Sequence, residues 1–142
     1  GHLLIYQHAG AKAVHAMELA AAQQAPLFKA ECAVLGVDFA HVGADLMRQW
    51  QLPQTLWEVT EYHIEPVKSE AFALSTCIVH IAAIIADADD QGLDVADALQ
   101  HVAPHAWQVT GLSASVGAGI VAKTVEQVGG ITQMILPSER AA

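Results

Sequence analysis

The feature that most constrains this fold is the apolar run AFALSTCIVHIAAIIA, which extends from Ala71 to Ala86. It holds sixteen residues and is interrupted only by Ser75, Thr76 and His80. A bilayer span needs about 20 apolar residues, which is more than this run provides. The run therefore predicts a central helix buried inside a globule, and it does not predict a membrane span.

The remaining segments also favour helices. Alanine is abundant, glycine and proline fall mostly between periodic segments, and no run alternates β-branched with polar residues. With 142 residues and 54% hydrophobic residues, the chain is long and apolar enough for one folded domain. We therefore expect an all-α fold and a single helical domain over residues 1–142, without internal repeats.

Prolines and glycines delimit the expected helices in the first part of the chain. A first helix covers much of Ala11 to Gln24 and a second covers Pro26 to Leu35, where Gly36 ends it. Asp38 then stands at an N-cap position. One apolar face is predicted to follow it, at Phe39, Val42, Leu46 and Trp50.

A short turn separates that helix from the next one. The helix is expected to end near Gln51, because Pro53 disfavours the α conformation at Leu52. Pro53 then begins a helix whose apolar positions are Leu56, Val59 and either Tyr62 or His63. The two helices should form a corner.

The second half of the chain, from Pro66 on, contains the apolar helix and several shorter helical segments. A connection over Pro66 to Ser69 precedes the apolar helix, for which Ser69 is the predicted cap, and the acidic turn 87–92 ends it. A helix over 94–102, a short piece near Trp107 and a closing helix from Ser113 follow. Glycines weaken the closing helix and indicate close packing or a break near Gly129.

The charge balance excludes some partners. Six Lys and Arg residues are scattered singly against fifteen Asp and Glu, so we expect neither nucleic-acid binding nor attachment to an anionic membrane surface. Cys32 and Cys77 lie in apolar stretches without metal-type spacing, which favours reduced, buried thiols. The first residues lack the charged start of a secretion signal, so the expected location is the cytoplasm.

Eight histidines raise the possibility of a metal site, but their spacing is a poor match for one. Only His101 and His105 are four residues apart, and Pro104 should break the helix between them. His41 lies one position off the apolar face, so it is predicted to be a polar or half-exposed residue of that helix. His80 lies in the apolar helix, where a neutral histidine bonded to the backbone is the usual finding. No nucleophile motif, phosphate loop or carboxylate pair is present, so we assign no catalytic residue, cofactor or metal ligand.

Four motifs in order give the chain a resemblance to a known family. GVDFAHVG, WQLP, YHIEP and VHIAA resemble the Gly-x-Asp-His-Ala-x-x-Gly, Trp-x-Leu-Pro, Tyr-His-His-x-Pro and Val-His-x-Ala-Asp motifs of the HDOD domain, a branch of the HD superfamily. The resemblance is clear over residues 1–90, and residues 91–142 resemble the variable C-terminal helices. It implies an HD-superfamily-like helical bundle. It also implies the C-terminal half of the domain, a fragment whose N-terminal half would lie upstream.

Departures from the family pattern fall where catalytic relatives hold metal. In the HD-GYP phosphodiesterases, histidines and aspartates at these positions bind ions that activate water. Here Phe39, Ile64 and Ala83 occupy three of the four positions, and only His63 is retained. One imidazole cannot hold an ion that needs three or more protein ligands. His63 is therefore the one vestigial ligand candidate, and His41 and His80 are the runners-up if metal is bound.

The resemblance implies a non-catalytic regulatory or output module of a bacterial signalling protein that acts by binding a protein partner. Two alternatives stay open: an HD-type metal-dependent phosphohydrolase, similar to cyclic-dinucleotide phosphodiesterases, and a nucleotide-sensing domain that reuses the former metal cavity. Since a missing half would leave apolar faces uncovered, homodimerisation, helix exchange and an exposed apolar patch are all expected options.

Overall fold

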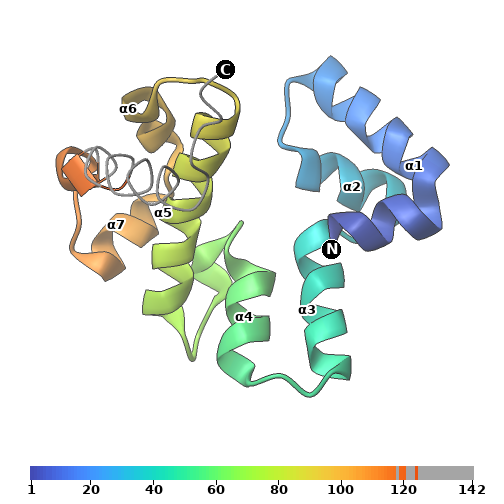
Figure 1. Ribbon diagram of the computed structural model, residues 1–142, viewed down its shortest axis with the longest axis horizontal. Coiled ribbons are helices and arrows are strands. Elements are labelled where there is room, and N and C mark those ends of the chain that lie inside the picture. The colour runs from blue at the N-terminus through green and yellow to red at the C-terminus, as the bar shows by residue number, and fades with distance from the viewer. Residues whose placement is uncertain (118, 121–123, 125–142) are drawn as a thin grey trace, which may run out of the picture.

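The computed structural model describes residues 1–117, 119, 120 and 124, and this part of the chain is all-α without strands (Figure 1). The predicted fold class is thus confirmed. The elements are α1 (His2–Gln23), α2 (Leu27–Leu35), α3 (Phe39–Gln49), α4 (Gln54–Tyr62), the 3₁₀ helix η1 (Pro66–Lys68), α5 (Ala73–Asp90), α6 (Val95–Ala98), the 3₁₀ helix η2 (Leu99–His101) and α7 (Pro104–Thr110).

The predicted helix boundaries around Gly36 are confirmed. Gly36 has a φ of 79°, a left-handed conformation that glycine adopts without steric cost, and its N–H donates to the Cys32 carbonyl. Asp38 then caps α3, because its side chain accepts a hydrogen bond from the His41 N–H at 2.9 Å. Two adjacent local signals therefore separate α2 from α3.

α3 and α4 lie side by side, joined by the short loop around Pro53 (Figure 1). The predicted turn is confirmed, and Phe39, Val42 and Leu46 of the predicted apolar face are half-buried. Trp50 is 64% exposed, whereas Ala40, Gly43 and Ala44 are buried. A Cβ on Gly43 would lie 3.3 Å from Thr60 Cγ2 of α4. Small residues permit this close approach, which hydrophobicity alone does not predict.

α1 is longer than expected, since it begins at His2 rather than near Ala11. Ala9 departs from helical geometry, with φ −135° and ψ 33°, and divides α1 into two stretches. The predicted helix corresponds to the second stretch. The first was missed because it buries only Ile5, so it has no apolar face along its length.

α5 begins at Ala73, so the predicted cap at Ser69 is wrong. The Ser69 hydroxyl instead donates to Glu58 Oε1 at 2.8 Å. The expectation of an enclosed central helix is also wrong, because α5 buries only one side. Leu74 is 54% exposed and Ile78 is 50% exposed.

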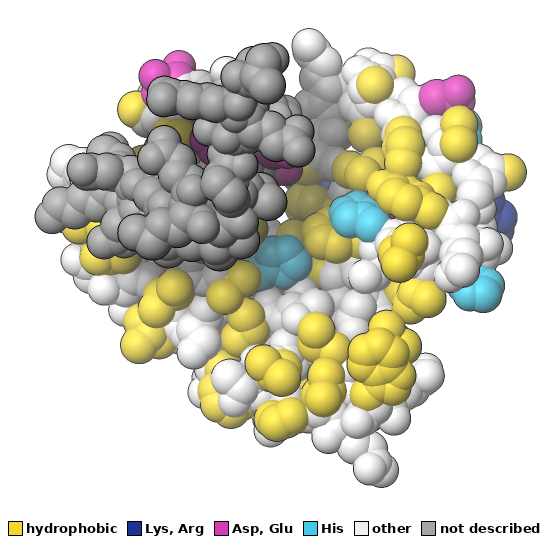
Figure 2. All heavy atoms as spheres, viewed as in Figure 1, with side chains coloured by type: hydrophobic (Ala, Val, Ile, Leu, Met, Phe, Trp, Pro, Cys, Tyr) yellow, Lys and Arg dark blue, Asp and Glu magenta, His cyan; other side chains and the backbone are white. Residues whose placement is uncertain are grey.

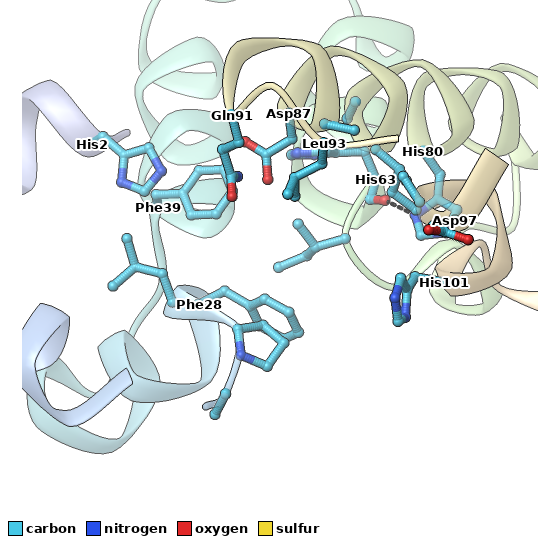
Figure 3. Close-up of a pocket in the computed structure, with 18 of the residues that line it drawn as sticks. His2, Phe28, Phe39, His63, His80, Asp87, Gln91, Leu93, Asp97 and His101 are labelled. Carbon is cyan, nitrogen blue, oxygen red and sulfur yellow. Dashed lines mark hydrogen bonds between the residues drawn. The ribbon is translucent and has the colours of Figure 1, made fainter. Parts of the chain in front are cut away.

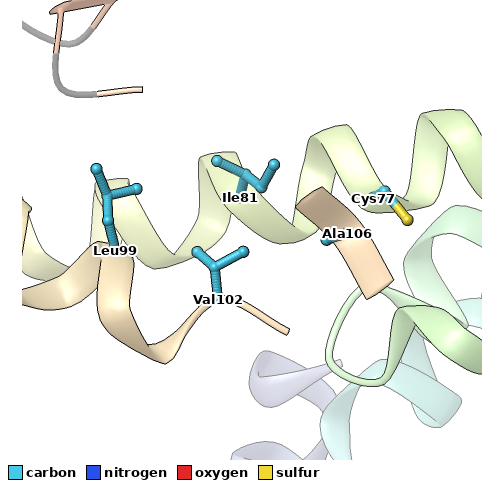
Figure 4. Packing of buried hydrophobic residues seen from close by; sticks show 5 residues of the cluster. All are labelled: Cys77, Ile81, Leu99, Val102 and Ala106. Atoms are coloured by element: carbon cyan, nitrogen blue, oxygen red, sulfur yellow. The ribbon is translucent and has the colours of Figure 1, made fainter. Parts of the chain in front are cut away.

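The main buried apolar cluster joins α5 to the helices that follow it (Figure 4). Cys77 and Ile81 of α5 pack with Leu99, Val102 and Ala106. The helix predicted over 94–102 is present as α6 and η2, and Asp94 caps it by accepting from the Ala96 and Asp97 N–H groups. The piece predicted near Trp107 is α7.

Other predictions have mixed outcomes. Gly117 is buried, and a Cβ there would lie 3.4 Å from Leu99, as close packing of the closing helix requires. The break predicted near Gly129 lies outside the described residues.

Both cysteines are free, but Cys32 is exposed, so only Cys77 is the buried thiol expected. Within the part of the chain that the structure describes, no helix has the length and apolar character needed to cross a bilayer.

Candidate functional site

A cavity of about 1040 Å³ lies between the α1–α2 side of the molecule and α5–α6. Figure 2 shows this face hollowed near its middle, with histidine side chains among hydrophobic ones. Figure 3 shows the lining side chains from close by. They are His2, Ala25, Pro26, Leu27, Phe28, Phe39, His63, Ile64, His80, Ala83, Ile84, Asp87, Ala88, Gln91, Leu93, Asp94, Asp97, Ala98 and His101.

The cavity brings together the four positions that the family resemblance relates to metal ligands. Phe39 comes from the start of α3, His63 and Ile64 from the end of α4, and Ala83 from α5. Residues up to 44 positions apart, from 39 to 83, therefore line one space. Three of these four side chains offer no metal-binding atom.

Aromatic rings form one wall of the cavity. The His2 ring stacks on Phe39 with centroids 4.0 Å apart, and Phe39 meets His63 edge-on at 5.7 Å. Glu31, which is buried, holds this wall by accepting from the Phe39 N–H at 2.9 Å. His2 Nδ1 lies 3.2 Å from Glu31 Oε1, an ion-pair distance that lacks hydrogen-bond alignment.

His63 occupies the C-cap of α4, the helix-end position that its sequence context predicts. Its Nδ1 lies 2.7 Å from the Thr60 carbonyl oxygen. Because a carbonyl can only accept, Nδ1 carries the proton in this bond and Nε2 of the neutral ring is an acceptor. One imidazole nitrogen is therefore available to a molecule in the cavity.

His80 is buried and uses both ring nitrogens for structure, as the sequence predicted. Nδ1 donates to the His63 carbonyl at 2.6 Å, and Nε2 accepts from the Ala103 N–H at 3.0 Å. Burial lowers the pKa of His80 below its usual value, although the bond to His63 opposes this. Since a metal ligand needs a free nitrogen lone pair, His80 cannot coordinate an ion in this arrangement.

His41 lies outside the cavity, in a polar cluster between α3 and α4. Its Nδ1 is 2.9 Å from Asp38 Oδ1, and its Nε2 is 3.9 Å from Glu61 Oε1. Arg48 pairs with both Glu61 and Asp45 and stacks on the Trp57 ring at 4.3 Å. The structure therefore separates His41 from His63 and His80, and the predicted half-exposed position of His41 is confirmed.

The last histidine pair is also divided. His101 ends η2, while His105 follows Pro104 in the first turn of α7, so the predicted helix break is confirmed. Over the described residues, no group of three or more His, Cys, Asp or Glu side chains is arranged to hold a metal ion.

Several lining residues were not singled out from the sequence, including His2, Phe28 and Asp97. Part of the signal was present in the spacing of α5, where His80, Ala83, Asp87 and Gln91 recur every three or four residues and share the cavity. The residues from α1 and α2 carried no such signal, because only tertiary packing places them opposite α5.

Glu58 connects α4 to the segment that precedes α5, at a place that does not line the cavity. This buried carboxylate accepts from the Ser69 hydroxyl at 2.8 Å and from the Ala71 and Phe72 N–H groups at 3.0 and 3.1 Å. It thereby satisfies backbone donors just before α5. The sequence analysis did not predict this buried acid.

The arrangement defines a helical protein with a mostly apolar cavity, which Phe39, His63, Ile64 and Ala83 line together. Residues 1–66 match the family model of the HDOD domain. The match covers 66 of 142 residues, less than half of the chain, and ends short of residue 90. It supports an HD-related output domain for this segment. Its placement as the C-terminal half of such a domain stays a prediction. No curated protein and no solved structure matches the chain.

Proposed function

We propose that this chain is a non-catalytic regulatory module of a bacterial signal-transduction protein, of the HDOD type, which acts in the cytoplasm by binding a protein partner. One observation carries the proposal: Phe39, Ile64 and Ala83 replace the family's ligand types and line the same cavity as His63. A cavity that has kept its place but exchanged three ligands for apolar groups suits binding better than hydrolysis.

The exposed side of α5 supports the binding role. Leu74 and Ile78 lie one turn apart and are each about half exposed. Apolar side chains that gather on a protein surface mark interaction sites more often than scattered ones do. Homodimerisation stays a prediction, which light scattering over a range of concentrations would test: a constant monomer mass would contradict it.

The alternative is a metal-dependent phosphohydrolase. It would need ligands besides His63, yet both nitrogens of His80 are engaged and His41 faces Asp38 and Glu61 away from the cavity. A nucleotide sensor is supported by the cavity itself. However, the described part of the chain contributes no lysine or arginine to the lining that could bind phosphate groups.

Metal content and hydrolysis together test the proposal. The full-length protein, purified without chelator and then loaded with Mn²⁺ or Fe²⁺, is expected to hold substoichiometric metal and to leave cyclic dinucleotides and bis-p-nitrophenyl phosphate intact. The His63→Ala variant serves as the matched control. Stoichiometric metal together with turnover that is lost in His63→Ala would overturn the non-catalytic assignment.

A further inference from the structure

We infer that the cavity binds a small organic cation, an amine or guanidine carried on an apolar or aromatic body. The inference rests on the proposed function, because a regulatory module of this kind would bind an organic ligand in the cavity and not hydrolyse it. It adds the chemical class of the ligand through which the regulatory module would receive its signal.

The charge of the lining favours a cation. Asp87 of α5 and Asp94 and Asp97 at α6 contribute carboxylates, and among the residues that the structure describes the lining includes neither lysine nor arginine. Figure 3 shows the Asp87 carboxylate beside the Gln91 amide, and Asp97 near His101 at the other end. The whole chain carries a formal charge of −9, which adds to the local field. An anionic ligand would be repelled on entry.

The remaining lining suits an apolar or aromatic body. Phe28 and Phe39 present rings to the cavity, and Ile64, Ile84 and Leu93 add aliphatic surface. The faces of aromatic rings attract cations as well as apolar groups. Cavities for drug-sized ligands measure about 300–1000 Å³. The observed volume of about 1040 Å³ is slightly above that range.

His63 supplies a polar contact that distinguishes a cation from a neutral apolar molecule. Its Nδ1 is engaged with the Thr60 carbonyl, so Nε2 of the neutral ring accepts. An ammonium or guanidinium group offers only donors, and these suit Nε2 and the carboxylates of the lining. The same geometry disfavours a carboxylate or phosphate ligand. The oxygen atoms of such a ligand accept hydrogen bonds, and so do Nε2 and the carboxylates of the lining.

A pair of probes that differ only in charge tests the inference on the full chain. Phenethylamine and 3-phenylpropionate are titrated by calorimetry, and thermal unfolding is followed in parallel. The amine is expected to bind and to raise the unfolding temperature, whereas the acid does neither. The carboxylates of the lining are exposed, and salt screens exposed charges. The affinity for the amine should therefore fall as the NaCl concentration is raised.

Variants locate the binding within the cavity. Asp87→Asn and Asp97→Asn are each expected to lower the affinity for the amine by roughly two- to fivefold. This is the contribution that an exposed pair of opposite charges usually makes. Asp89→Asn removes the same charge from an exposed position of α5 outside the lining and should leave the affinity unchanged. Ala83→Leu narrows the cavity and should also weaken binding.

The outcomes separate this inference from the proposed function. Equal binding of amine and acid, no binding of the amine, or equal losses in Asp89→Asn and Asp87→Asn would each overturn it. Binding of a short arginine-containing peptide in place of the small amine would overturn it in favour of peptide docking. Metal content decides the non-catalytic assignment separately, because it is measured without any organic probe.

Discussion

At the scale of single residues, the buried acid Glu58 joins α4 to the start of α5. Burial opposes its charge, but bonds from Ser69, Gln54, Phe72 and Ala71 outweigh that cost and lower the pKa of the carboxyl group. A lowered pKa means that the fold favours the ionised form. The corresponding stability is present above the ordinary pKa of glutamate and is lost as the pH falls below it.

Glu58→Gln should therefore destabilise the protein by about 1–3 kcal/mol at neutral pH. The NH₂ group of the glutamine side chain would face hydrogen-bond donors that the carboxylate of Glu58 accepts from. The measurement is urea unfolding of both proteins between pH 7 and pH 3. The gap between them should shrink as the pH falls from the ordinary pKa of glutamate through the lowered pKa of Glu58, because the preference of the fold for the ionised group is lost over that range. Glu70→Gln, at an exposed position, is the control and should change little. A gap that is constant with pH would show that the charge of Glu58 does not matter.

His80 predicts a pH dependence of its own. Its pKa is lowered by burial, so the folded state favours the neutral ring, and the unfolded state binds more protons once the pH falls below about 6.5. His80→Ala should cost about 1–3 kcal/mol at pH 8, because the His63 carbonyl and the Ala103 N–H lose their partner. That cost should shrink toward pH 5.5.

Unfolding free energies at several pH values test this expectation, with His15→Ala on the exposed side of α1 as the control. Protonation of Nε2 would remove the acceptor for the Ala103 N–H, which is why the wild-type advantage should fall in acid. A cost that instead grows in acid would show that the protonated ring is the stabilising form.

At the scale of elements, the contact between α3 and α4 depends on a residue without a side chain. A Cβ at Gly43 would lie 3.3 Å from Thr60 Cγ2, while a Cβ at Gly10 of α1 would meet nothing within 4 Å. Two glycines in helices thus have opposite surroundings, although the sequence presents them alike.

Substitutions at these two glycines should therefore have opposite effects. Gly10→Ala is expected to stabilise the protein by about 0.5–1 kcal/mol, because alanine favours helix. Gly43→Val is expected to destabilise it by about 1–3 kcal/mol, because its methyl groups overpack the contact. Thermal and urea unfolding measure both. Equal stability of Gly43→Val and wild type would show that the two helices can separate without cost.

At the scale of the whole molecule, the charge balance opposes compaction. The formal charge is −9, and the two surface ion pairs Lys68–Glu65 and Arg48–Asp45 add little stability. Raising NaCl from low to moderate concentration should stabilise the fold by up to about 1 kcal/mol, because screening reduces repulsion more than it weakens such pairs.

Urea unfolding at several salt concentrations measures this effect. A double variant, Asp89→Asn with Asp90→Asn, changes the formal charge from −9 to −7 and should reduce the salt dependence. Both positions are exposed, so the fold should be unaffected. If salt lowers the stability of the wild type, specific ion pairs outweigh the general repulsion.

The sequence by itself determined the helical class and the ends of several helices. Gly36, Asp38 and Pro53 act through their own backbone preferences and nearby hydrogen bonds, so local reasoning located them. The structural roles of His63 and His80 were also predicted, since a helix end and an apolar helix each restrict what an imidazole can do.

Only the tertiary structure decided which faces are buried and what surrounds the cavity. Burial depends on neighbours far away in the chain, and for this reason Glu58 is interior while Trp50 is exposed. The wall of His2 and Phe39 opposite Asp87 of α5 likewise exists only after α1, α3 and α5 have packed around one space. Local preferences act over a few residues, whereas the cavity joins side chains from most of the described chain.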